Sequence, residues 1–431
     1  MSAQKNKTSG EIICEILCIG REILDGRVID TNSTAIAQEI SKIGLRPQYA
    51  QKVDDDAARM KEAFQIAKSR AEIVFVCGGL GPTTDDRTLE IFSEFIGHKM
   101  TQYPDALEFL SKLLLSLNRP MNEPQLKQTR FPEGGSIIEN PNGTACGFEI
   151  EWQGTRWFFL PGPPRELIPM LQQSIVPKLS GGKKFMSRAW ITHFIGESDL
   201  QLKLNSVIQK IPGDWDFSFQ DRFPEVALGL HAPGDANSEL FQKLCQEIRT
   251  ILDGFFWHEG EHSRIKLEEK VVDVLRQRNS KLVSVESCTG GMIAERITDV
   301  AGSSDVFLAS WVTYANEAKI QLGVTENSIK QYGAVSEAVA QEMAAAGLKS
   351  AQTFWPHKQD RIISISDSGV AGPGGGSAEK PVGLCQIAIA DSAGSQACER
   401  IQTSFKYSRD RNRRYFSQKA LALVLKTLTN S

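Results

Sequence analysis

The stretch EIVFVCGGLGP, residues 72–82, is a short apolar run that ends in a glycine turn. An apolar run without polar alternation is typical of a strand that is buried on both faces of a sheet. Upstream, residues 12–20 form a similar run, and residues 31–43 and 57–67 space their apolar side chains as amphipathic helices do. This order of strand, helix, helix and strand predicts a parallel sheet covered by helices.

The rest of the chain divides into parts of different pattern. The first pattern continues to about residue 175, whereas residues 183–256 contain two strand-like and two helix-like segments with no cluster of reactive side chains. From about residue 265, helical and strand patterns alternate again. A chain of 431 residues has room for about three domains. We therefore predict an α/β domain over 1–175, a small α+β domain over 183–256 and a second α/β domain over 265–431.

The composition argues against several classes of protein. The net charge of −3 is spread along the chain and gives nucleic acid little to bind. No apolar run approaches the roughly 20 residues that span a bilayer, and the start MSAQKNKTSG lacks the apolar core of a signal peptide. The eight cysteines form no C-x-x-C pair, which favours reduced, packed thiols. We expect a cytoplasmic protein that binds neither membranes nor nucleic acid.

The loop CGGLGPTTDDRT, residues 77–88, follows a predicted strand and precedes a helix. Its glycines allow the backbone amides to face an anion at a helix N-terminus. Asp85 and Asp86 could bind a divalent cation that bridges a pyrophosphate. A carboxylate that caps the helix would explain the same residues without a ligand, and the sequence leaves both interpretations open.

SVESCTGG, residues 284–291, lies at a second junction of this kind. The amides from Thr289 to Gly291 are placed to hold a phosphate at the helix N-terminus. Cys288 is the obvious candidate nucleophile, since a helix N-terminus lowers a thiol pKa. No histidine lies near it in the sequence, however, so a packed thiol is the alternative.

A lysine and a serine flank the next predicted strand, in GSSDVFLASWVTYANEAK. Lys319 lies near the start of a helix, where the helix dipole and partial burial would lower its pKa. A neutral lysine can serve as a base towards a serine such as Ser304. An exposed surface lysine is the alternative. The loop SDSGVAGPGGGSAEKPVG, residues 366–383, follows another strand and is a candidate ligand loop.

The segment WHEGEHS, residues 257–263, contains the H-E-x-x-H spacing of helical zinc sites. It lies in a polar stretch with no apolar helix around it and no evident third ligand. We therefore interpret it as a linker, and the metal content of the chain stays unknown.

Several longer segments carry a family resemblance. VESCTGGMIAERITDVAGSSDVF, VTYANEAKIQLGV and SGVAGPGGGSAEKPVG resemble the signature segments of the CinA C-terminal domain. IGREILDGRVIDTNS, GGLGPTTDD, NPNGTACGF and LPGPPRE are similar to the molybdopterin-binding-like domain of the same family. The resemblance covers essentially the whole chain. It implies two α/β three-layer domains, one molybdopterin-binding-like and one of the CinA C-terminal type, joined by a small α+β domain of KH type.

In that family the C-terminal domain hydrolyses the carboxamide of nicotinamide mononucleotide, giving nicotinate mononucleotide and ammonia in pyridine-nucleotide salvage. The resemblance implies that Ser304 attacks the carbonyl while neutral Lys319 takes its proton, with Tyr314 beside them, and that no cofactor is needed. The residues expected to complete the pocket and hold the ribose and phosphate are Ser287, Thr289, Gly290, Gly291, Ser368, Gly369, Gly372 and Arg409, with Arg411 or Arg413 as substitutes for the arginine.

The resemblance also implies a second site in the N-terminal domain, because related domains hydrolyse ADP-ribose with a divalent metal. Its expected residues are Gly78, Gly79, Gly81 and Asp86. Two positions depart from the family pattern: Arg21 follows Ile-Gly, and Arg87-Thr88-Leu89-Glu90 replaces Leu-Thr-Arg-Glu. A positive charge at Arg21 would perturb metal binding.

Three functions follow from these resemblances. The first is the amidase alone, the second is a bifunctional enzyme that also cleaves ADP-ribose, and the third is a non-catalytic partner in DNA uptake or damage response. The family resemblance further implies small-molecule nucleotide substrates and a homo-oligomer, with a dimer expected.

Overall fold

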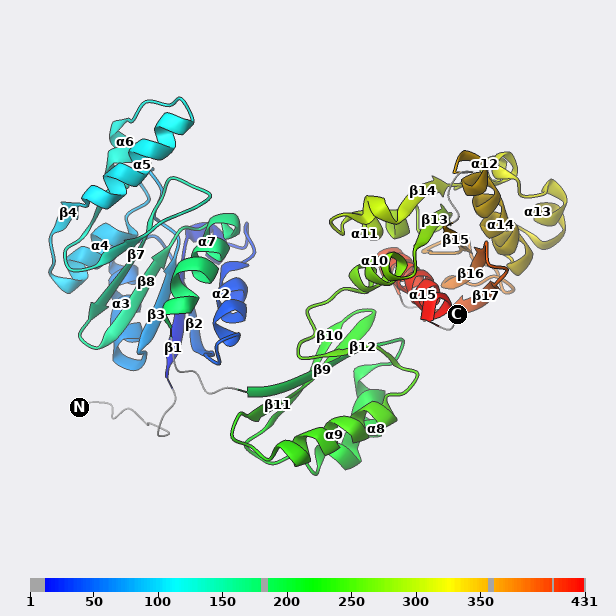
Figure 1. Ribbon diagram of the computed structural model, residues 1–431, viewed down its shortest axis with the longest axis horizontal. Coiled ribbons are helices and arrows are strands. Elements are labelled where there is room, and N and C mark those ends of the chain that lie inside the picture. The colour runs from blue at the N-terminus through cyan, green and yellow to red at the C-terminus, as the bar shows by residue number, and fades with distance from the viewer. Residues whose placement is uncertain (1–11, 180–184, 356–359, 405–406, 430–431) are drawn as a thin grey trace. The chain divides into compact units, whose positions relative to one another are not determined.

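The computed structural model describes residues 12–179, 185–355, 360–404 and 407–429. The chain forms two compact units, one of residues 1–185 with 233–235, and one of residues 186–232 with 236–431 (Figure 1). The second unit contains two separate sheets; the first extends past the predicted 183–256 domain to Gly260, and the second lies within the predicted 265–431 domain. No helix among the described residues has the length and apolar character needed to cross a membrane.

The N-terminal unit is built on a six-stranded sheet of order β2-β1-β3-β8-β7-β6. Pairing is parallel from β2 to β8 and antiparallel from β8 to β6. The predicted parallel sheet is therefore confirmed for four strands, and an antiparallel edge extends it. The strands are β1 Cys14–Ile19, β2 Pro47–Val53, β3 Ile73–Cys77, β6 Ser136–Ile138, β7 Gly147–Trp152 and β8 Thr155–Leu160.

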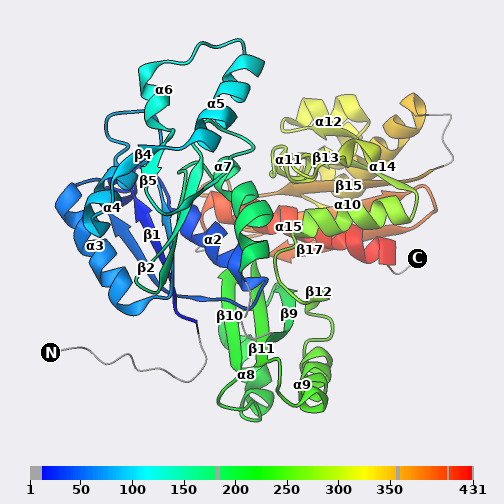
Figure 2. The ribbon, with the colours of Figure 1, turned by 60° about the vertical axis from the view of Figure 1, so that its left-hand side comes forward.

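Helices cover both faces of this sheet, which makes three layers (Figure 2). Successive residues of β1 point to opposite faces of the sheet. Ile16 and Cys18 therefore share one face and pack under α2 (Asn32–Ser41) and α7 (Pro164–Met170). Leu17 and Ile19 pack under α3 (Ala57–Arg70) and α4 (Thr88–Ile96) on the other face. The remaining elements are α1 Arg21–Leu24, β4 Met100–Gln102, α5 Pro104–Ser116, α6 Glu123–Lys127, β5 Arg130–Pro132, η1 Leu171–Ile175 and η2 Val176–Lys178.

The middle part has a four-stranded sheet of order β10-β11-β9-β12, with α8 (Glu197–Ile208) and α9 (Ser238–Ile251) packed on it. The strands are β9 Phe185–His193, β10 Asp216–Arg222, β11 Glu225–Pro233 and β12 Phe256–Gly260. The linker interpretation of residues 257–263 is wrong at its start, because Trp257 to Gly260 lie in β12 and His258 to Gly260 pair with β9. His258 Nε2 lies 3.2 Å from the His262 carbonyl oxygen rather than beside a second imidazole.

The C-terminal part has a five-stranded sheet of order β14-β13-β15-β16-β17. The three strands β14, β13 and β15 are parallel, and β16 and β17 extend the sheet antiparallel. The strands are β13 Ser280–Glu286, β14 Phe307–Val312, β15 Arg361–Gly369, β16 Leu384–Asp391 and β17 Gln396–Gln402. On the face of β17 that packs against the core beneath α15 (Arg409–Thr429), only Ala397 and Ile401 are apolar, and most of its seven residues are half-exposed or exposed. β17 was therefore not among the strands expected from the sequence.

Two groups of helices enclose this sheet. α10 (Leu267–Gln277), α11 (Met292–Thr298) and α15 (Arg409–Thr429) pack on one face against Leu282, Ile365 and Ile387. α14 (Glu337–Phe354) packs on the other face against Val285 and Ala388. α12 (Asn316–Leu322) and α13 (Glu326–Tyr332) lie beside α14 (Figure 1). The expected three-layer α/β fold is confirmed for this part.

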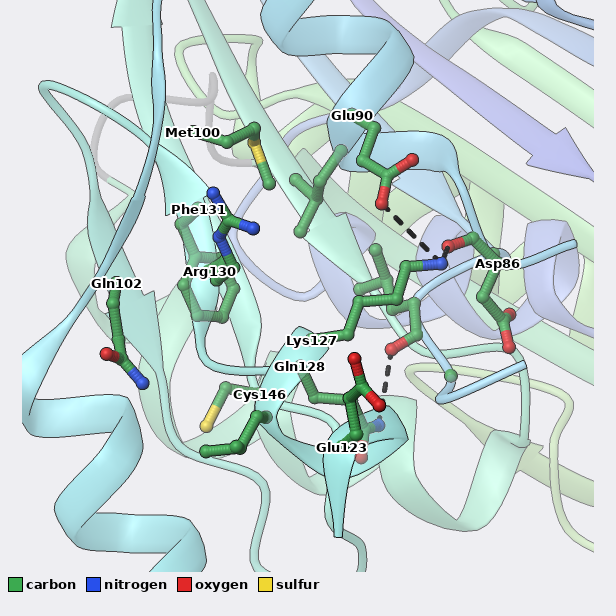
Figure 3. A pocket seen from close by; sticks show the side chains of 15 residues that line it. Asp86, Glu90, Met100, Gln102, Glu123, Lys127, Gln128, Arg130, Phe131 and Cys146 are labelled. Carbon is green, nitrogen blue, oxygen red and sulfur yellow. Dashed lines mark hydrogen bonds and ion pairs between the residues drawn. The ribbon is translucent and has the colours of Figure 1, made fainter. Parts of the chain in front are cut away.

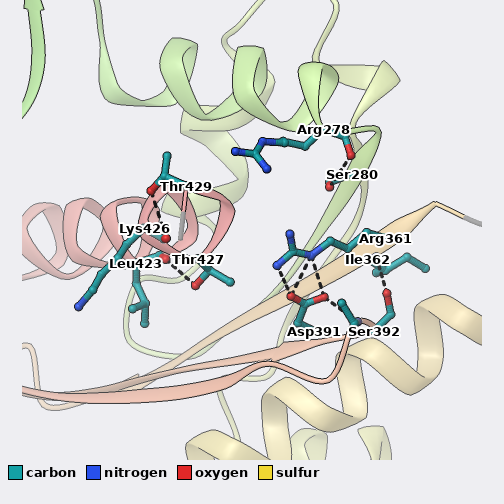
Figure 4. Close-up of polar contacts among 11 residues, drawn as sticks. Arg278, Ser280, Arg361, Ile362, Asp391, Ser392, Leu423, Lys426, Thr427 and Thr429 are labelled. Atoms are coloured by element: carbon teal, nitrogen blue, oxygen red, sulfur yellow. Dashed lines mark hydrogen bonds and ion pairs between the residues drawn. The ribbon is translucent and has the colours of Figure 1, made fainter. Parts of the chain in front are cut away.

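A buried ion pair fixes the end of the sheet where β15 begins (Figure 4). Arg361 Nε lies 3.1 and 2.9 Å from the two carboxylate oxygens of Asp391, whose side chain is fully buried. The Ile362 amide donates to Ser392 Oγ at 2.9 Å on the same turn. Since a buried carboxylate is costly without a partner, Arg361 should contribute strongly to the stability of this part.

We predict that Arg361→Met lowers the free energy of unfolding by about 3 kcal/mol, because it leaves the Asp391 carboxylate buried without its cation. Urea denaturation of the full chain measures this. Arg414→Met is the matched control, since the Arg414–Asp410 pair is exposed on both sides and should leave the transition unchanged. Equal shifts for the two variants would contradict the prediction.

Candidate active site

Lys319 and Ser287 meet at the edge of the C-terminal sheet where parallel strands end. β13 ends at Glu286, and Ser287 follows it; the neighbouring β14 ends at Val312, and α12 begins four residues later. The carboxyl ends of parallel strands are the usual place for ligand sites in such sheets. Lys319 is 1% exposed and Ser287 8% exposed. The alternative of a surface lysine is therefore wrong.

The contacts of the Lys319 amine accommodate a neutral amine as well as an ammonium, because Nζ faces three oxygens. Its Nζ lies 2.6 Å from the Thr313 carbonyl oxygen, 3.5 Å from the Tyr314 carbonyl oxygen and 3.1 Å from Ser287 Oγ. A neutral amine has two hydrogens and one lone pair. The two carbonyls can accept the hydrogens, which leaves the lone pair for the Ser287 hydroxyl. Burial lowers the pKa of Lys319, against the opposing effects of Asp367 and Cys288.

Two buried carboxylates, Glu286 and Asp367, lie beneath this pair and are joined by Thr289. Thr289 Oγ1 is 2.7 Å from Glu286 Oε2 and 2.6 Å from Asp367 Oδ2. One hydroxyl hydrogen cannot serve two ionised oxygens, so one carboxyl must itself carry a proton. Burial, followed by the charge of Glu286, raises the pKa of Asp367. Asp367 is therefore the carboxyl whose protonation its surroundings favour.

The amides expected to cradle a phosphate are occupied by these same carboxylates. Glu286 accepts hydrogen bonds from the amides of Gly291, Ile293 and Ala294 at 2.9–3.1 Å, and Asp367 accepts from the Thr289 amide at 3.1 Å. The Gly290 amide donates to the Ser287 carbonyl. The phosphate cradle predicted at residues 289–291 is thus filled by the chain's own side chains, because a buried Glu286 already satisfies the first turn of α11.

Cys288 is a packed thiol, as the alternative interpretation predicted. It is 5% exposed, and its Sγ lies 3.0 Å from Asp367 Oδ1 and 3.8 Å from the Cys385 sulfur. The hydrogen bond with Cys385, together with burial, raises the pKa of Cys288 well above its ordinary value. A thiol held protonated in this way is a poor nucleophile.

The glycine loop and α15 contribute residues on the solvent side of Lys319. Arg409 donates to the Tyr314 hydroxyl at 2.7 Å and to the Gly372 carbonyl at 2.8 Å, so three of the expected site residues are in contact. Ser368 is buried and donates to the Ala334 carbonyl at 2.7 Å, which makes it a support of the loop. Gly369 lies in β15 with no room for a side chain, since an added Cβ would lie 2.6 Å from the Leu384 carbonyl oxygen.

The substitute arginines have other contacts. Arg413 donates to the Thr289 carbonyl oxygen through Nε at 3.1 Å and Nη2 at 2.6 Å, which ties α15 to the SCTGG turn. The Arg411 guanidinium lies over the Tyr407 ring at 4.8 Å. Of the three arginines, Arg409 is the one in contact with Tyr314.

Ser304 lies at the other end of β14. It is exposed in the short turn η3 (Ser303–Asp305), which precedes β14, whereas Lys319 follows the far end of that strand. The six residues of β14 span roughly 17 Å at about 3.3 Å per residue. The expected Ser304–Lys319 contact is therefore not formed within the described chain, and a role for Ser304 in catalysis stays a prediction. The hydroxyl within reach of Lys319 is that of Ser287.

Sequence reasoning missed the two carboxylates that hold the site together. Both had a local signal: Glu286 ends an apolar strand, and Asp367 interrupts the apolar run of β15. A carboxylate inside a buried strand needs partners, and that requirement could have pointed to Thr289 and the turn after β13.

The N-terminal unit contains two cavities at the glycine turn. Figure 3 looks into the first, of about 620 Å³, which we call the Lys127 cavity after the lysine on its wall. Lys127 Nζ donates to the carbonyl oxygens of Asp86 at 2.7 Å and Thr83 at 3.1 Å and lies 3.6 Å from Glu90 Oε1. The predicted residues Gly79, Gly81 and Asp86 lie on its wall.

The second cavity, of about 560 Å³, is lined by all four predicted residues, Gly78, Gly79, Gly81 and Asp86. We call it the Asn32 cavity. Gly78 and Gly79 have φ of 105° and 68°, and a Cβ at Gly78 would lie 2.3 Å from the Ile19 carbonyl oxygen. Only glycine therefore fits the wall at these two positions.

Two amide oxygens on the wall of the Asn32 cavity are buried without a partner, Asn32 Oδ1 and Gln128 Oε1. Asn32 Nδ2 donates to the Gly162 carbonyl at 2.7 Å, and Gln128 Nε2 to the Leu80 carbonyl at 3.4 Å. These donations fix which end of each amide is the oxygen. Two residues of the cavity wall thus carry a buried amide oxygen without a hydrogen-bond partner.

No group of three His, Cys, Asp or Glu side chains gathers at the glycine turn among the described residues. Asp86 Oδ2 accepts hydrogen bonds from the Thr83 amide at 2.9 Å and from the Thr83 hydroxyl, and it thereby closes a turn. The residue that precedes α4 is Arg87, so the alternative that Asp86 caps this helix is wrong. Among the described residues, one group of three candidate ligands lies close together, and it is Cys288, Asp367 and Cys385. Arg21, the other departure, pairs with Asp54 at 3.3 Å.

Comparison with known proteins covers both units. The CinA C-terminal domain model matches residues 264–428, and the model described as a probable molybdopterin binding domain matches residues 15–181. A putative competence-damage inducible protein of Caldicellulosiruptor saccharolyticus is 35% identical over 427 residues, covering 97% of this chain and 100% of the relative. One from Clostridium botulinum is 37% identical over 385 residues, covering 87% of this chain and 90% of the relative.

Two solved structures each match part of the chain. A CinA protein of unknown function from Thermoplasma acidophilum is 32% identical, and the match covers 38% of this chain and 96% of that one, with a TM-score of 0.36. A competence/damage inducible protein from Agrobacterium tumefaciens gives 32% identity, 39% and 99% coverage and a TM-score of 0.34. With relatives aligned over nearly its whole length, the chain belongs to the CinA family of competence-damage inducible proteins.

Proposed function

We propose that the C-terminal part hydrolyses the carboxamide of nicotinamide mononucleotide to nicotinate mononucleotide and ammonia. One observation carries this proposal: the buried Lys319 amine lies 3.1 Å from the Ser287 hydroxyl, and two carbonyls take its hydrogens. Burial lowers the pKa of Lys319, so the amine can be neutral and act as a base. A serine beside a neutral lysine is the pair that amide hydrolysis needs.

The proposed reaction has two stages. Ser287 Oγ attacks the carboxamide carbon while Lys319 Nζ takes the hydroxyl proton. Lys319 then gives this proton to the leaving nitrogen, so ammonia departs and an ester joins the nicotinyl group to Ser287. Water attacks the ester carbon as Lys319 removes its proton. The second collapse releases nicotinate mononucleotide and returns the proton to Ser287.

The contact between Tyr314 and Arg409 supports an assignment for the charged end of the substrate. Tyr314 is 60% exposed, and Arg409 links its hydroxyl to the Gly372 carbonyl on the solvent side of Lys319. A guanidinium is well suited to bind a phosphate with two parallel hydrogen bonds. We therefore assign binding of the substrate phosphate to Arg409, because the amides of the turn at 289–291 are already occupied.

We predict that Ser287→Ala and Lys319→Met each lower kcat/KM for ammonia release from nicotinamide mononucleotide by 100-fold or more. Cys288→Ala and Ser304→Ala should each stay within a few-fold of the unsubstituted protein, because neither side chain contacts Lys319 among the described residues. The opposite result, loss in Ser304→Ala with activity kept in Ser287→Ala, would restore Ser304 as the attacking residue.

The protonation states give a pH prediction. Lys319 must be neutral to act, so kcat/KM should rise with pH and level off above a midpoint below the ordinary lysine value of 10.5. Because Asp367 opposes the effect of burial on Lys319, Asp367→Asn should lower the Lys319 pKa further and move that midpoint to lower pH. An unchanged midpoint in this variant would contradict the prediction and show that Asp367 carries no charge next to Lys319.

We propose as a second function that the N-terminal unit hydrolyses ADP-ribose. The two unmet acceptors in the Asn32 cavity support a ligand that carries hydrogen-bond donors, as an adenine amino group or ribose hydroxyls do. A divalent metal is not held by any preassembled group of three ligands at Asp86 in the described chain. The proposal therefore rests on the cavity and its acceptors.

We predict that the full chain releases AMP from ADP-ribose in the presence of Mg²⁺ or Co²⁺. Gln128→Met keeps the length of the side chain but removes the acceptor, and it should raise KM by roughly tenfold. Lys319→Met is the control, since it should leave AMP release unchanged. Absence of AMP release from the unsubstituted chain contradicts this second function.

The names of the relatives refer to competence and damage, which raises the third possibility, a non-catalytic partner of DNA. A net charge of −3 does not favour it. An electrophoretic shift of DNA that weakens with salt, together with no ammonia release, is the result that would favour this function over the amidase.

A further inference from the structure

Two thiols of the N-terminal unit lie in contact beside the Asn32 cavity. Cys18 of β1 and Cys77 of β3 are register partners on neighbouring parallel strands, and their sulfurs are 3.1 Å apart. Both residues are buried and both thiols are free. Neighbouring strands lie about 4.8 Å apart, which is within the range of Cα separations that a disulfide spans.

The surroundings of the pair shift the pKa values of the two thiols in opposite directions. Cys18 Sγ also lies 3.2 Å from Ser33 Oγ and 3.5 Å from Asp30 Oδ1. The hydrogen bond from Cys77, followed by that from Ser33, lowers the pKa of Cys18 despite burial. The same contact with Cys18 raises the pKa of Cys77. The contact between the two sulfurs thus shifts their pKa values in opposite directions, lower for Cys18 and higher for Cys77.

A small oxidant has a route to this pair. Cys77 lies on the wall of the Asn32 cavity, next to Asn32 and Gly78, and Cys18 lies directly behind it. The two glycines after Cys77 leave the backbone without side chains at this point of the wall. A peroxide that enters the cavity therefore comes next to Cys77, and because this residue is 1% exposed a small local movement is needed to uncover its sulfur.

The other buried thiols provide a contrast. Cys288 and Cys385 are also neighbours, at 3.8 Å, but the pKa of each is raised, and Asp367 rather than a cavity lies beside them. Burial raises the pKa of Cys14 to about 12, and the described contact of its sulfur is with the Ile12 carbonyl oxygen. Only the Cys18–Cys77 pair combines contact, a lowered pKa and a cavity wall among the described residues.

We propose that Cys18 and Cys77 form an oxidisable dithiol, which a peroxide converts to a disulfide at the floor of the Asn32 cavity. In the first step a thiolate attacks one peroxide oxygen, giving a sulfenic acid and water after protonation. In the second, the other sulfur displaces hydroxide from the sulfenic sulfur, and a second water forms. Two thiols lose two electrons, the peroxide gains them, and attack by either sulfur gives the same product.

The bond would alter the ligand cavity. Closing the pair draws Cys77 towards β1, and Cys77 is followed directly by Gly78 and Gly79 of the cavity wall. Thiol reductants reverse the reaction by exchange. Oxidation state and the shape of the cavity are therefore linked, independently of the amidase and of whatever ligand the cavity holds.

The test uses the full, reduced chain treated with hydrogen peroxide, unfolded in iodoacetamide and digested with trypsin. The expected products are a loss of 2 Da, six alkylated thiols out of eight, and a cross-link between peptides 8–21 and 71–87 that dithiothreitol removes. Peptide 282–296, with Cys288, should stay alkylated.

Matched variants identify the sulfurs. Cys14 and Cys18 lie on the same tryptic peptide, so the cross-link should persist in Cys14→Ala and disappear in Cys18→Ala and in Cys77→Ala. The proposal is overturned if Cys18 and Cys77 remain alkylated in the unsubstituted chain, or if the Cys288–Cys385 bridge forms at lower peroxide than theirs. The unsubstituted chain already shows whether the bridge forms, so the test stays conclusive if one of the variants fails to fold.

Discussion

The buried carboxylate of Glu286 is the constraint on which the C-terminal site depends. It accepts the amides of Gly291, Ile293 and Ala294 and the Thr289 hydroxyl, which fixes the turn between β13 and α11. Ser287 begins this turn, so the position of its hydroxyl follows from the same bonds. The charge of Glu286 also raises the pKa of Asp367. Asp367 in turn opposes the lowering of the Lys319 pKa by burial.

The layers of the fold could be predicted because they follow from local patterns. Apolar runs such as 73–77 and the helical spacing at 57–67 are visible within a few residues, and both gave the correct element. The antiparallel edges β7 and β17 are different, since pairing direction depends on how distant strands meet. β10 and β12 were missed because their residues are mostly half-exposed or exposed and carry no continuous apolar run.

The candidate site was predicted only in part, because some of its contacts join residues that lie far apart in the sequence. The family resemblance identified Lys319, Tyr314, Arg409 and Ser287, which the structure places together in two contacts. It could not reveal that Thr289 and the amides after it are already satisfied, because that depends on Glu286 and on Asp367 of β15, 78 residues further along the chain. The resemblance likewise implied Ser304, although a whole strand separates it from Lys319.

The neighbours Ser287 and Cys288 show how one turn selects between two nucleophiles. Intrinsic reactivity favours the thiol, since a thiolate is the stronger nucleophile. The surroundings reverse that order: Cys288 points to Asp367 and Cys385, which hold its proton, whereas Ser287 points to a buried amine that can remove one. The turn after β13 thus directs the thiol to Asp367 and Cys385 and the hydroxyl to Lys319. The stronger nucleophile is thereby kept inert by its position, and the weaker one is activated.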